Sequence, residues 1–305
     1  MSINGLLVVI GGPTASGKTK IAASVAKHFG TEVISGDSRQ FYRAMRIGTA
    51  RPSEEELLGV KHRFLGHLEL NETWSAGEFA RQAEPVLQEL LGKLGIAVLV
   101  GGSGLYLDAL CNGLDPMPMV DHAVREKLQH RFQQHGLPDL LTDLDRLDPA
   151  ISKVIDRNNP QRVIRALEIC LLSGKPFSAQ HSGQRHRTDI QVLRIAMDVP
   201  REALYANIDA RVDRMIAEGL EEEARSLLPH RELNSLRTVG YREFFEHFDS
   251  MLSHAETIEL IKQHTRNYAK RQVTWLRREK AWKWMRPDDI DAMLRCVDES
   301  IGRQT

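Results

Sequence analysis

The stretch that most constrains the fold is GPTASGKT at residues 12–19. It follows an apolar run at 6–10, typical of a buried parallel strand, and precedes 20–29, where apolar residues recur at helical spacing. A strand, a glycine-rich turn and a helix in this order form a phosphate-binding loop, because the N–H groups of the turn and the helix N-terminus face the same anion. A chance match would lack this context. We therefore expect a phosphate site made of Gly12, Pro13, Thr14, Ala15, Ser16, Gly17, Lys18 and Thr19.

Two side chains of this loop have a predicted chemical role. Lys18 adds a positive charge beside the phosphate, and the hydroxyl of Thr19 is expected to ligate Mg²⁺. Loops of this kind usually hold a nucleoside triphosphate, so the motif alone leaves open what phosphate is bound and what is done with it.

The pattern after the loop predicts an α/β fold with a mostly parallel sheet, similar to the core of P-loop NTPases. Strands are expected at 32–35, 63–70 and 96–100, with an amphipathic helix at 78–91. The chain then becomes polar and helical, and strand character returns at 191–197. We therefore predict a first part of the core at 1–114, a helical insertion domain at 115–189, and a second part of the core at 190–305 that is helical from residue 201 to the end.

Three further groups of residues stand where a ligand is expected. Asp37 and Ser103 each follow a predicted strand, and open α/β sheets bind ligands at the carboxyl ends of their strands. Asp37 as a helix cap and Ser103 as part of a tight turn are the structural alternatives. Arg162 and Arg165 share a helical face beside Gln161. In that segment Asn159 is a natural helix cap and Pro160 a natural first residue, which leaves the arginines unexplained.

Arg211 and Arg214 also share a helical face, and a solvated surface is their structural alternative. The strongest charge asymmetry lies between residues 262 and 286, where cations alternate with aromatic residues. The cations are Lys262, Arg266, Lys270, Arg271, Arg277, Arg278, Lys280, Lys283 and Arg286, and the aromatics are Tyr268, Trp275, Trp282 and Trp284. We read this segment as a basic C-terminal helix that binds a nucleic-acid backbone and unstacked bases. The alternative is a basic helix whose tryptophans anchor it to the core.

Composition adds few constraints. Lys plus Arg and Asp plus Glu each number 41, so the net charge indicates no partner. The 3 cysteines form no CxxC pair, which argues against a disulfide framework or a zinc site. No segment has the length of a membrane span or of a signal peptide. We expect a cytoplasmic protein that acts as a monomer and does not associate with membranes.

With GPTASGKT, DSRQFYRAMRIGTARPS, GGSGLYLDAL, NPQRVIRALEI, TVGYREF and AKRQVTWLR in this order, the chain resembles the bacterial tRNA dimethylallyltransferases, also called tRNA isopentenyltransferases. The likeness extends from residue 6 to about residue 284. The DSRQ segment with IGTARPS behind it is more specific than the phosphate loop alone.

This resemblance implies that the loop holds the diphosphate of dimethylallyl diphosphate instead of ATP. The dimethylallyl group would go to N6 of the adenosine 3′ of the anticodon, with release of pyrophosphate. Asp37 would accept the N6 proton, while Lys18 and Arg211 would neutralise the diphosphate. The anticodon stem-loop of tRNA would be bound by Asp37, Ser38, Arg39, Gln40, Ser103, Arg125, Gln161, Arg162, Val163, Ile164 and Arg165.

The sequence departs from the family pattern at a few positions. Ser103 stands where the family usually has threonine, and Asn207 stands where it usually has arginine. Arg46 and Arg51 stand where aspartate and lysine are common. Three rival functions remain at this point: a small-molecule or nucleotide kinase, an enzyme that prenylates free AMP, and an RNA-binding protein with a relict phosphate loop.

Overall fold

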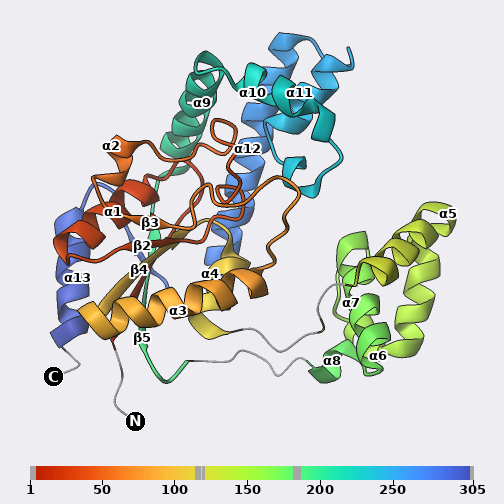
Figure 1. The fold of residues 1–305 in the computed structure, drawn as a ribbon, viewed down its shortest axis with the longest axis horizontal. Coiled ribbons are helices and arrows are strands. Elements are labelled where there is room, and N and C mark those ends of the chain that lie inside the picture. Colours follow the sequence, from red (N-terminus) through yellow and green to blue (C-terminus); the bar gives the residue numbers. More distant parts are fainter. Residues whose placement is uncertain (1–4, 114–117, 119–120, 181–186, 303–305) are drawn as a thin grey trace. The chain divides into compact units, whose positions relative to one another are not determined.

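The computed structural model describes residues 5–113, 118, 121–180 and 187–302. The chain forms two compact units, one made of residues 1–111 and 187–305 and the other of 112–186 (Figure 1). The first unit contains the sheet and the phosphate loop. In the described residues of the second unit, all the secondary-structure elements are helices, joined by turns.

The first unit is built on a 6-stranded sheet with the order β3-β2-β4-β1-β5-β6. All neighbouring strands pair in parallel, so the predicted α/β fold with a mostly parallel sheet is confirmed. The strands are β1 (Leu6–Gly11), β2 (Val33–Ser35), β3 (His62–Arg63), β4 (Ile96–Gly101), β5 (Gln191–Met197) and β6 (Lys283–Met285).

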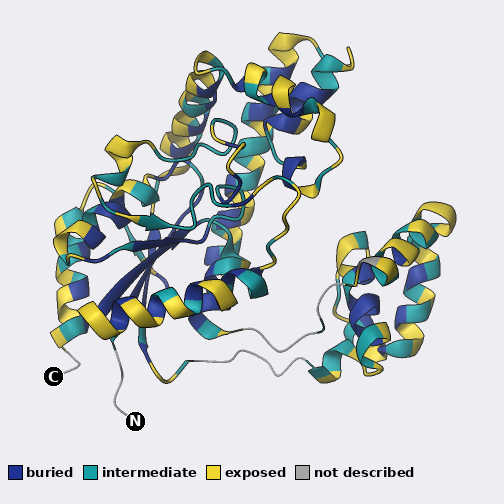
Figure 2. Cartoon of the chain, in the orientation of Figure 1, coloured by how far each residue is buried: buried dark blue, intermediate teal, exposed yellow. Residues whose placement is uncertain are grey.

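Strand β1 lies in the middle of this sheet and is buried along its whole length (Figure 2). Because side chains alternate along a strand, its residues divide between two cores. Leu6, Val8 and Ile10 pack with α1 (Lys18–His28) and α13 (Ile290–Gly302). Leu7 and Val9 belong to the opposite core, with α3 (Ala76–Leu94) and α4 (Gly104–Asn112). Both faces of the sheet are therefore covered by helices, as a parallel sheet requires.

The C-terminal half is mostly helical, as expected, with one exception. The basic helix, α12 (His254–Leu276), ends before Arg277, and residues 283–285 form β6 beside β5. The prediction of a continuous helix through Arg286 is therefore wrong, because residues 283–285 extend the sheet by one parallel strand. The predicted strand at 63–70 is wrong over most of its length, because only Arg63 of this range belongs to a strand, β3.

The other helices of the first unit are α2 (Glu54–Leu57), α9 (Arg201–Ala217), α10 (Leu220–Leu227) and α11 (Tyr241–Phe248), with 3-10 turns at Leu228–His230 and Asn234–Leu236. No helix in the described ranges is both long enough and apolar enough to cross a bilayer.

Two tryptophans near the C-terminus, Trp275 and Trp282, pack inside the first unit, which we call the sheet unit. Trp282 is only 5% exposed, and its ring lies edge-on to Trp275, with ring centroids 6.4 Å apart. A side chain at Gly11 would place a Cβ 2.7 Å from the Trp282 ring, and one at Gly104 would place a Cβ 2.1 Å from the Trp275 ring. The anchoring alternative therefore describes these two residues, and Trp282 is not available to stack on a base.

The helical unit has a small core of its own. Its helices are α5 (His122–Leu147), α6 (Pro149–Ser152), α7 (Pro160–Ser173) and α8 (Phe177–Gln180). Helix α5 is interrupted at Gly136, whose φ of 75° lies in the left-handed region that favours glycine. Asn159 caps α7 by accepting a hydrogen bond from the N–H of Arg162 at 3.2 Å, so the predicted cap is confirmed.

Two glycine substitutions test the close packing of Trp275. Gly104→Ala should lower the free energy of unfolding by about 1–3 kcal/mol, because the new methyl group overlaps the Trp275 ring. Gly92→Ala, inside α3 with nothing within 4 Å of its Cβ position, should raise it by about 0.5–1 kcal/mol, because alanine costs less backbone entropy in a helix.

The measurement is urea unfolding followed by tryptophan fluorescence, since all 4 tryptophans lie in the sheet unit. Equal midpoints for the two variants would contradict the packing described above.

Candidate active site

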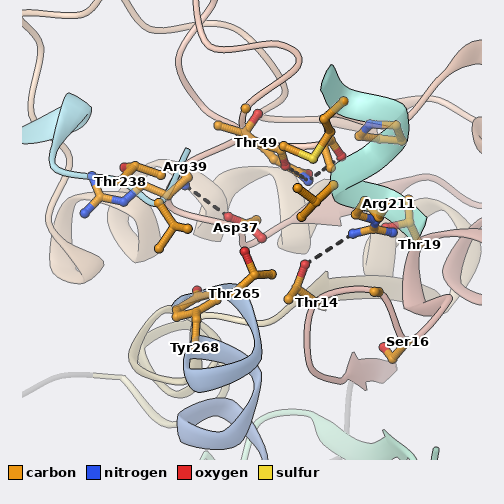
Figure 3. A pocket seen from close by; sticks show the side chains of 18 of the residues that line it. Thr14, Ser16, Thr19, Asp37, Arg39, Thr49, Arg211, Thr238, Thr265 and Tyr268 are labelled. Atoms are coloured by element: carbon orange, nitrogen blue, oxygen red, sulfur yellow. Dashed lines mark hydrogen bonds between the residues drawn. The ribbon is translucent and has the colours of Figure 1, made fainter. Parts of the chain in front are cut away.

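A cavity of about 330 Å³ lies at the carboxyl edge of the sheet. The register explains its position: Gly11 at the end of β1 is level with Gly101 of β4 and Ala196 of β5, so the loops after these strands leave the sheet at the same edge. Around the cavity, Figure 3 shows the phosphate loop, the segment after β2 and the helices α9 and α12.

The phosphate loop has the turn geometry that its glycines predict. Gly17 caps α1 with a φ of 80°, and Ala15 also has a positive φ, of 62°. A Cβ on Gly12 would lie 2.6 Å from the Ser16 hydroxyl, so the turn has no room for a side chain there. This backbone brings residues 14–19 to the cavity wall at the N-terminus of α1, where the helix dipole favours an anion.

One buried glutamine on α12 holds this loop in place. The N–H of Thr14 donates to Gln272 Oε1 at 2.8 Å, and Gln272 Nε2 donates to the carbonyl of Gly102 at 2.9 Å. Gln272 is 6% exposed and therefore joins the phosphate loop, the loop after β4 and α12 within the protein interior. The N–H of Thr14 is consequently engaged inside the protein.

Two cations of the cavity are largely removed from water. Burial lowers the pKa of Lys18 to about 8, against the opposing effect of the Asp37 carboxylate, and Arg211 lowers it further. Burial is also the main cause that lowers the pKa of Arg211, whose Nη1 donates to the Thr14 hydroxyl at 3.2 Å. Desolvated positive charges of this kind favour a bound anion, because water compensates them poorly.

Asp37 follows β2 and lines the same cavity. Its Oδ1 accepts a hydrogen bond from the N–H of Arg39 at 3.0 Å, so it shapes a turn and does not cap a helix. Figure 3 shows Asp37 facing the space that Thr14 and Arg211 also border. A carboxylate close to the phosphate loop and to a half-buried lysine can accept a proton from a bound substrate.

The remaining predicted residues of the sheet unit lie around this centre. Arg39 and Gln40 line the cavity, whereas Ser38 and Ser103 pair with each other through their hydroxyl groups at 3.2 Å. Arg39 donates to the carbonyls of Asn234 and Ser235, so part of its hydrogen-bonding capacity is used within the protein. Gly12 and Pro13 belong to the phosphate loop but are not among the residues that line the cavity.

The other predicted contact residues belong to the helical unit. Arg125 and Arg165 each form an ion pair with Glu168, at 3.0 Å and 2.9 Å, and Glu168 is fully buried. Val163 and Ile164 are buried in the core of this unit, so their side chains do not reach its surface. Gln161 and Arg162 are exposed. Binding of tRNA by Arg125, Gln161, Arg162 and Arg165 stays a prediction.

Several cavity residues were not predicted as site residues. Apolar side chains line part of the wall. Residues from the segments 48–52 and 237–242 line another part of it. The apolar residues are Val212, Met215, Val239 and Ile261, and the polar ones include Thr49, Arg237, Thr238 and Thr265. The sequences RIGTARPS and TVGYREF contain some of these residues, but neither motif by itself indicates that its side chains reach the phosphate loop.

Comparison with known proteins gives a consistent result. The family model for IPP transferase matches residues 40–279. The chain belongs to the IPP transferase family. It is 42% identical over 295 residues to tRNA dimethylallyltransferase 1 of Bacteroides fragilis, which covers 97% of this chain and 98% of that protein. It is 45% identical over 283 residues to the tRNA dimethylallyltransferase of Christiangramia forsetii, covering 93% and 94% of the two chains.

Solved structures of the family share the fold. The tRNA isopentenylpyrophosphate transferase of Bacillus halodurans superimposes with a TM-score of 0.72 at 34% identity, over 98% of this chain and 97% of the other. A eukaryotic dimethylallyltransferase acting on tRNA superimposes with a TM-score of 0.82 at 24% identity, over 99% and 80% of the two chains. The resemblance to tRNA dimethylallyltransferases is thereby confirmed.

The lowered pKa of Lys18 leads to a pH-dependent prediction. The pKa of Lys18 is about 8, so in the free site this side chain loses its positive charge as the pH rises above that value. In the complex, the negative charge of the bound diphosphate keeps Lys18 protonated to higher pH. Affinity for a non-hydrolysable dimethylallyl diphosphate analogue should therefore fall by roughly tenfold from about pH 7 to about pH 9.

Calorimetric titration across this range measures the effect. Lys18→Ala should bind weakly, with a much flatter profile, and Lys27→Ala, an exposed lysine on the same helix, should behave like the unmodified chain. A steep profile in Lys18→Ala would assign the titration to another group.

Proposed function

We propose that the chain transfers the dimethylallyl group of dimethylallyl diphosphate to N6 of the adenosine 3′ of the anticodon in tRNA, with release of pyrophosphate. The observation that carries this proposal is the composition of one cavity, which combines a phosphate loop, the carboxylate of Asp37 and an apolar wall. The phosphate loop suits the diphosphate, and the apolar wall suits a short branched hydrocarbon. The names of the relatives support the reaction and the tRNA substrate.

The proposed residues account for each part of the reaction. The bond between the allylic carbon and the diphosphate oxygen breaks, and its electron pair leaves with pyrophosphate. Lys18 and Arg211 stabilise the negative charge that develops on the leaving group. The N6 lone pair forms the new bond to carbon, and Asp37 takes the N6 proton. An exocyclic amine of adenine is a poor nucleophile, so removal of this proton assists the attack.

The donor atoms at the loop suit Mg²⁺. Within the described part of the chain, no three His, Cys, Asp or Glu side chains gather to hold a metal ion. Mg²⁺ requires few protein ligands when it binds through substrate phosphates, and Thr19 brings a hydroxyl oxygen to the cavity wall. In the proposed complex Thr19 and the diphosphate would hold the ion, which would supply additional neutralisation of the leaving group.

Recognition of tRNA is proposed to combine phosphate contacts with extrusion of the target base. N6 of a stacked base is inaccessible to a cavity of this kind, so the adenosine must leave the stack. Exposed cations on and after α12 include Lys270, Arg277 and Arg278. In the helical unit, Arg162 is exposed on the first turn of α7. We propose that both sets neutralise phosphates of the anticodon stem-loop.

Asp37→Asn tests the proton acceptor. This variant retains an oxygen for the N–H of Arg39 but is a far weaker base, so single-turnover prenylation should slow by about 10²–10⁴-fold while tRNA affinity changes only a few-fold. The measurement is mass spectrometry of tRNA nucleosides after incubation with dimethylallyl diphosphate and Mg²⁺.

A parallel incubation replaces dimethylallyl diphosphate by ATP. Phosphoryl transfer from ATP in that incubation would favour a kinase. Normal single-turnover rates in Asp37→Asn, with weakened tRNA binding, would overturn the assignment of Asp37 as the base.

Salt dependence tests the phosphate contacts. For a single-stranded loop each neutralised phosphate adds about 0.7 to the slope of log affinity against log salt, and for a duplex about 0.9. Arg278→Ala should therefore weaken stem-loop binding and flatten the slope by roughly one contact. Gln40→Ala should leave the slope unchanged and lower turnover, because in this proposal the Gln40 side chain faces the extruded adenosine from the cavity wall.

Binding is measured by fluorescence anisotropy over a salt series. Free AMP serves as the comparison acceptor and should be a poor one, since it makes none of these contacts. Prenylation of AMP as efficient as that of tRNA would contradict the proposed substrate.

A further inference from the structure

A carboxylate far from the phosphate loop in sequence organises one wall of the cavity. Glu223 lies on α10, and its Oε2 accepts hydrogen bonds from the N–H groups of Arg46 at 3.0 Å and Ile47 at 2.9 Å. Its Oε1 accepts from the N–H of Gly48 at 2.9 Å and from the hydroxyl of Tyr241 at 2.7 Å. Four donors thus converge on one side chain.

The segment held in this way continues directly into the cavity. Gly48, Thr49 and Ala50 line it, and the carbonyls of Thr49 and Ala50 each accept a hydrogen bond from Gln40 Nε2 at 3.1 Å. The position of the Gln40 side chain therefore depends on the path of the backbone at 49–50. The backbone that leads into residues 49–50 is in turn held by Glu223 through the N–H groups of residues 46–48.

Packing at Gly48 leaves this segment little freedom. A Cβ at Gly48 would lie 2.4 Å from the ring of Tyr241, which is fully buried. Burial, together with the Glu223 carboxylate, raises the pKa of the Tyr241 hydroxyl, so this group remains a donor. Arg51 is a charged side chain that interacts electrostatically with Glu223, and its guanidinium donates to the carbonyls of Tyr42 and Arg43 at 2.7 Å.

The chemistry requires a carboxylate at this position. Both oxygens of a glutamate accept hydrogen bonds, which matches two N–H donors on one side and an N–H and a hydroxyl on the other. A glutamine would turn an NH₂ group toward donors and leave at least one of them without a partner.

We propose that Glu223 is a positioning residue for the acceptor side of the cavity. It sets the backbone at 46–50 and through it places Gln40 for the extruded base, without contacting the substrate itself. This inference rests on the proposed function, in which Gln40 faces the target adenosine.

The test compares Glu223→Gln with Glu222→Gln, an exposed neighbour on the same helix that loses the same charge. Glu223→Gln should lower the single-turnover rate on an anticodon stem-loop by about 10–100-fold, because misplacement by about 1 Å costs that order of rate. The KM for dimethylallyl diphosphate should change less than about threefold, since the phosphate loop is not held by Glu223. Tyr241→Phe, which removes one of the four donors, should have a smaller effect in the same direction.

A double-mutant cycle distinguishes positioning from general damage to the fold. If Glu223 acts through Gln40, the variant that combines Gln40→Ala with Glu223→Gln should be no more than about threefold slower than Gln40→Ala alone. Multiplicative losses in the double variant, or equal losses in Glu222→Gln, would overturn the proposal.

Hydrogen exchange supplies a measurement that does not depend on activity. The amides of residues 46–48 should exchange faster in Glu223→Gln than in Glu222→Gln, with unfolding midpoints of the two variants matched. Faster exchange with an unchanged prenylation rate would overturn the positioning role. Absence of tRNA prenylation by the unmodified chain would instead contradict the proposed function and would leave the exchange result to stand by itself.

Discussion

The whole site depends on the parallel pairing of β1 with β4 on one side and β5 on the other. This pairing is in register at the carboxyl ends, where Gly11 meets Gly101 and Ala196. Because parallel strands end at the same edge, three loops separated by many residues leave the sheet side by side. The phosphate loop is thereby brought next to the loop after β4, and the segment after β2 places Asp37 beside it.

The C-terminal half of the chain completes the cavity through a few polar contacts, one buried at Gln272 and one half-buried at Glu223. Gln272 connects α12 to the N–H of Thr14 and to the carbonyl of Gly102. Glu223 connects α10 to the backbone at 46–48. Polar contacts that are wholly or partly shielded from water specify geometry, since leaving such a hydrogen bond unmade costs more than forming it contributes. The phosphate loop and the acceptor wall are therefore each fixed from a helix that follows them by well over a hundred residues.

Charge in the cavity is arranged for an anionic ligand. Lys18 belongs to the phosphate loop, Arg211 donates to it from α9, and burial is the main cause that lowers the pKa of both. Preorganised cations in such a site stabilise charge on a leaving group without the reorganisation that water would need. In the proposed reaction this arrangement acts on the diphosphate, while Asp37 acts on the acceptor. Stabilisation of the leaving diphosphate and removal of the acceptor proton are thus assigned to side chains from different elements around one cavity.

The α/β class, the phosphate loop and the family could be predicted from the amino-acid sequence, because these features depend on the local order of residues. A strand, a turn and a helix are neighbours in the chain, and GPTASGKT, DSRQ and GGSG each follow a strand directly. Local order does not predict β6. Residues after Leu276 continue the basic pattern of α12, yet residues 283–285 form a strand because the edge of β5 is open to pairing. Likewise Val163 and Ile164 share a segment with Arg162 but are buried, since the opposite face of α7 forms the core of its unit. The folded chain, in contrast, was needed to show that Thr49, Arg237 and Ile261 line one cavity with Lys18, and that Glu223 reaches the turn at 46–48. These contacts join residues far apart in the chain, and no spacing in the sequence encodes which distant side chain will meet a given backbone N–H group.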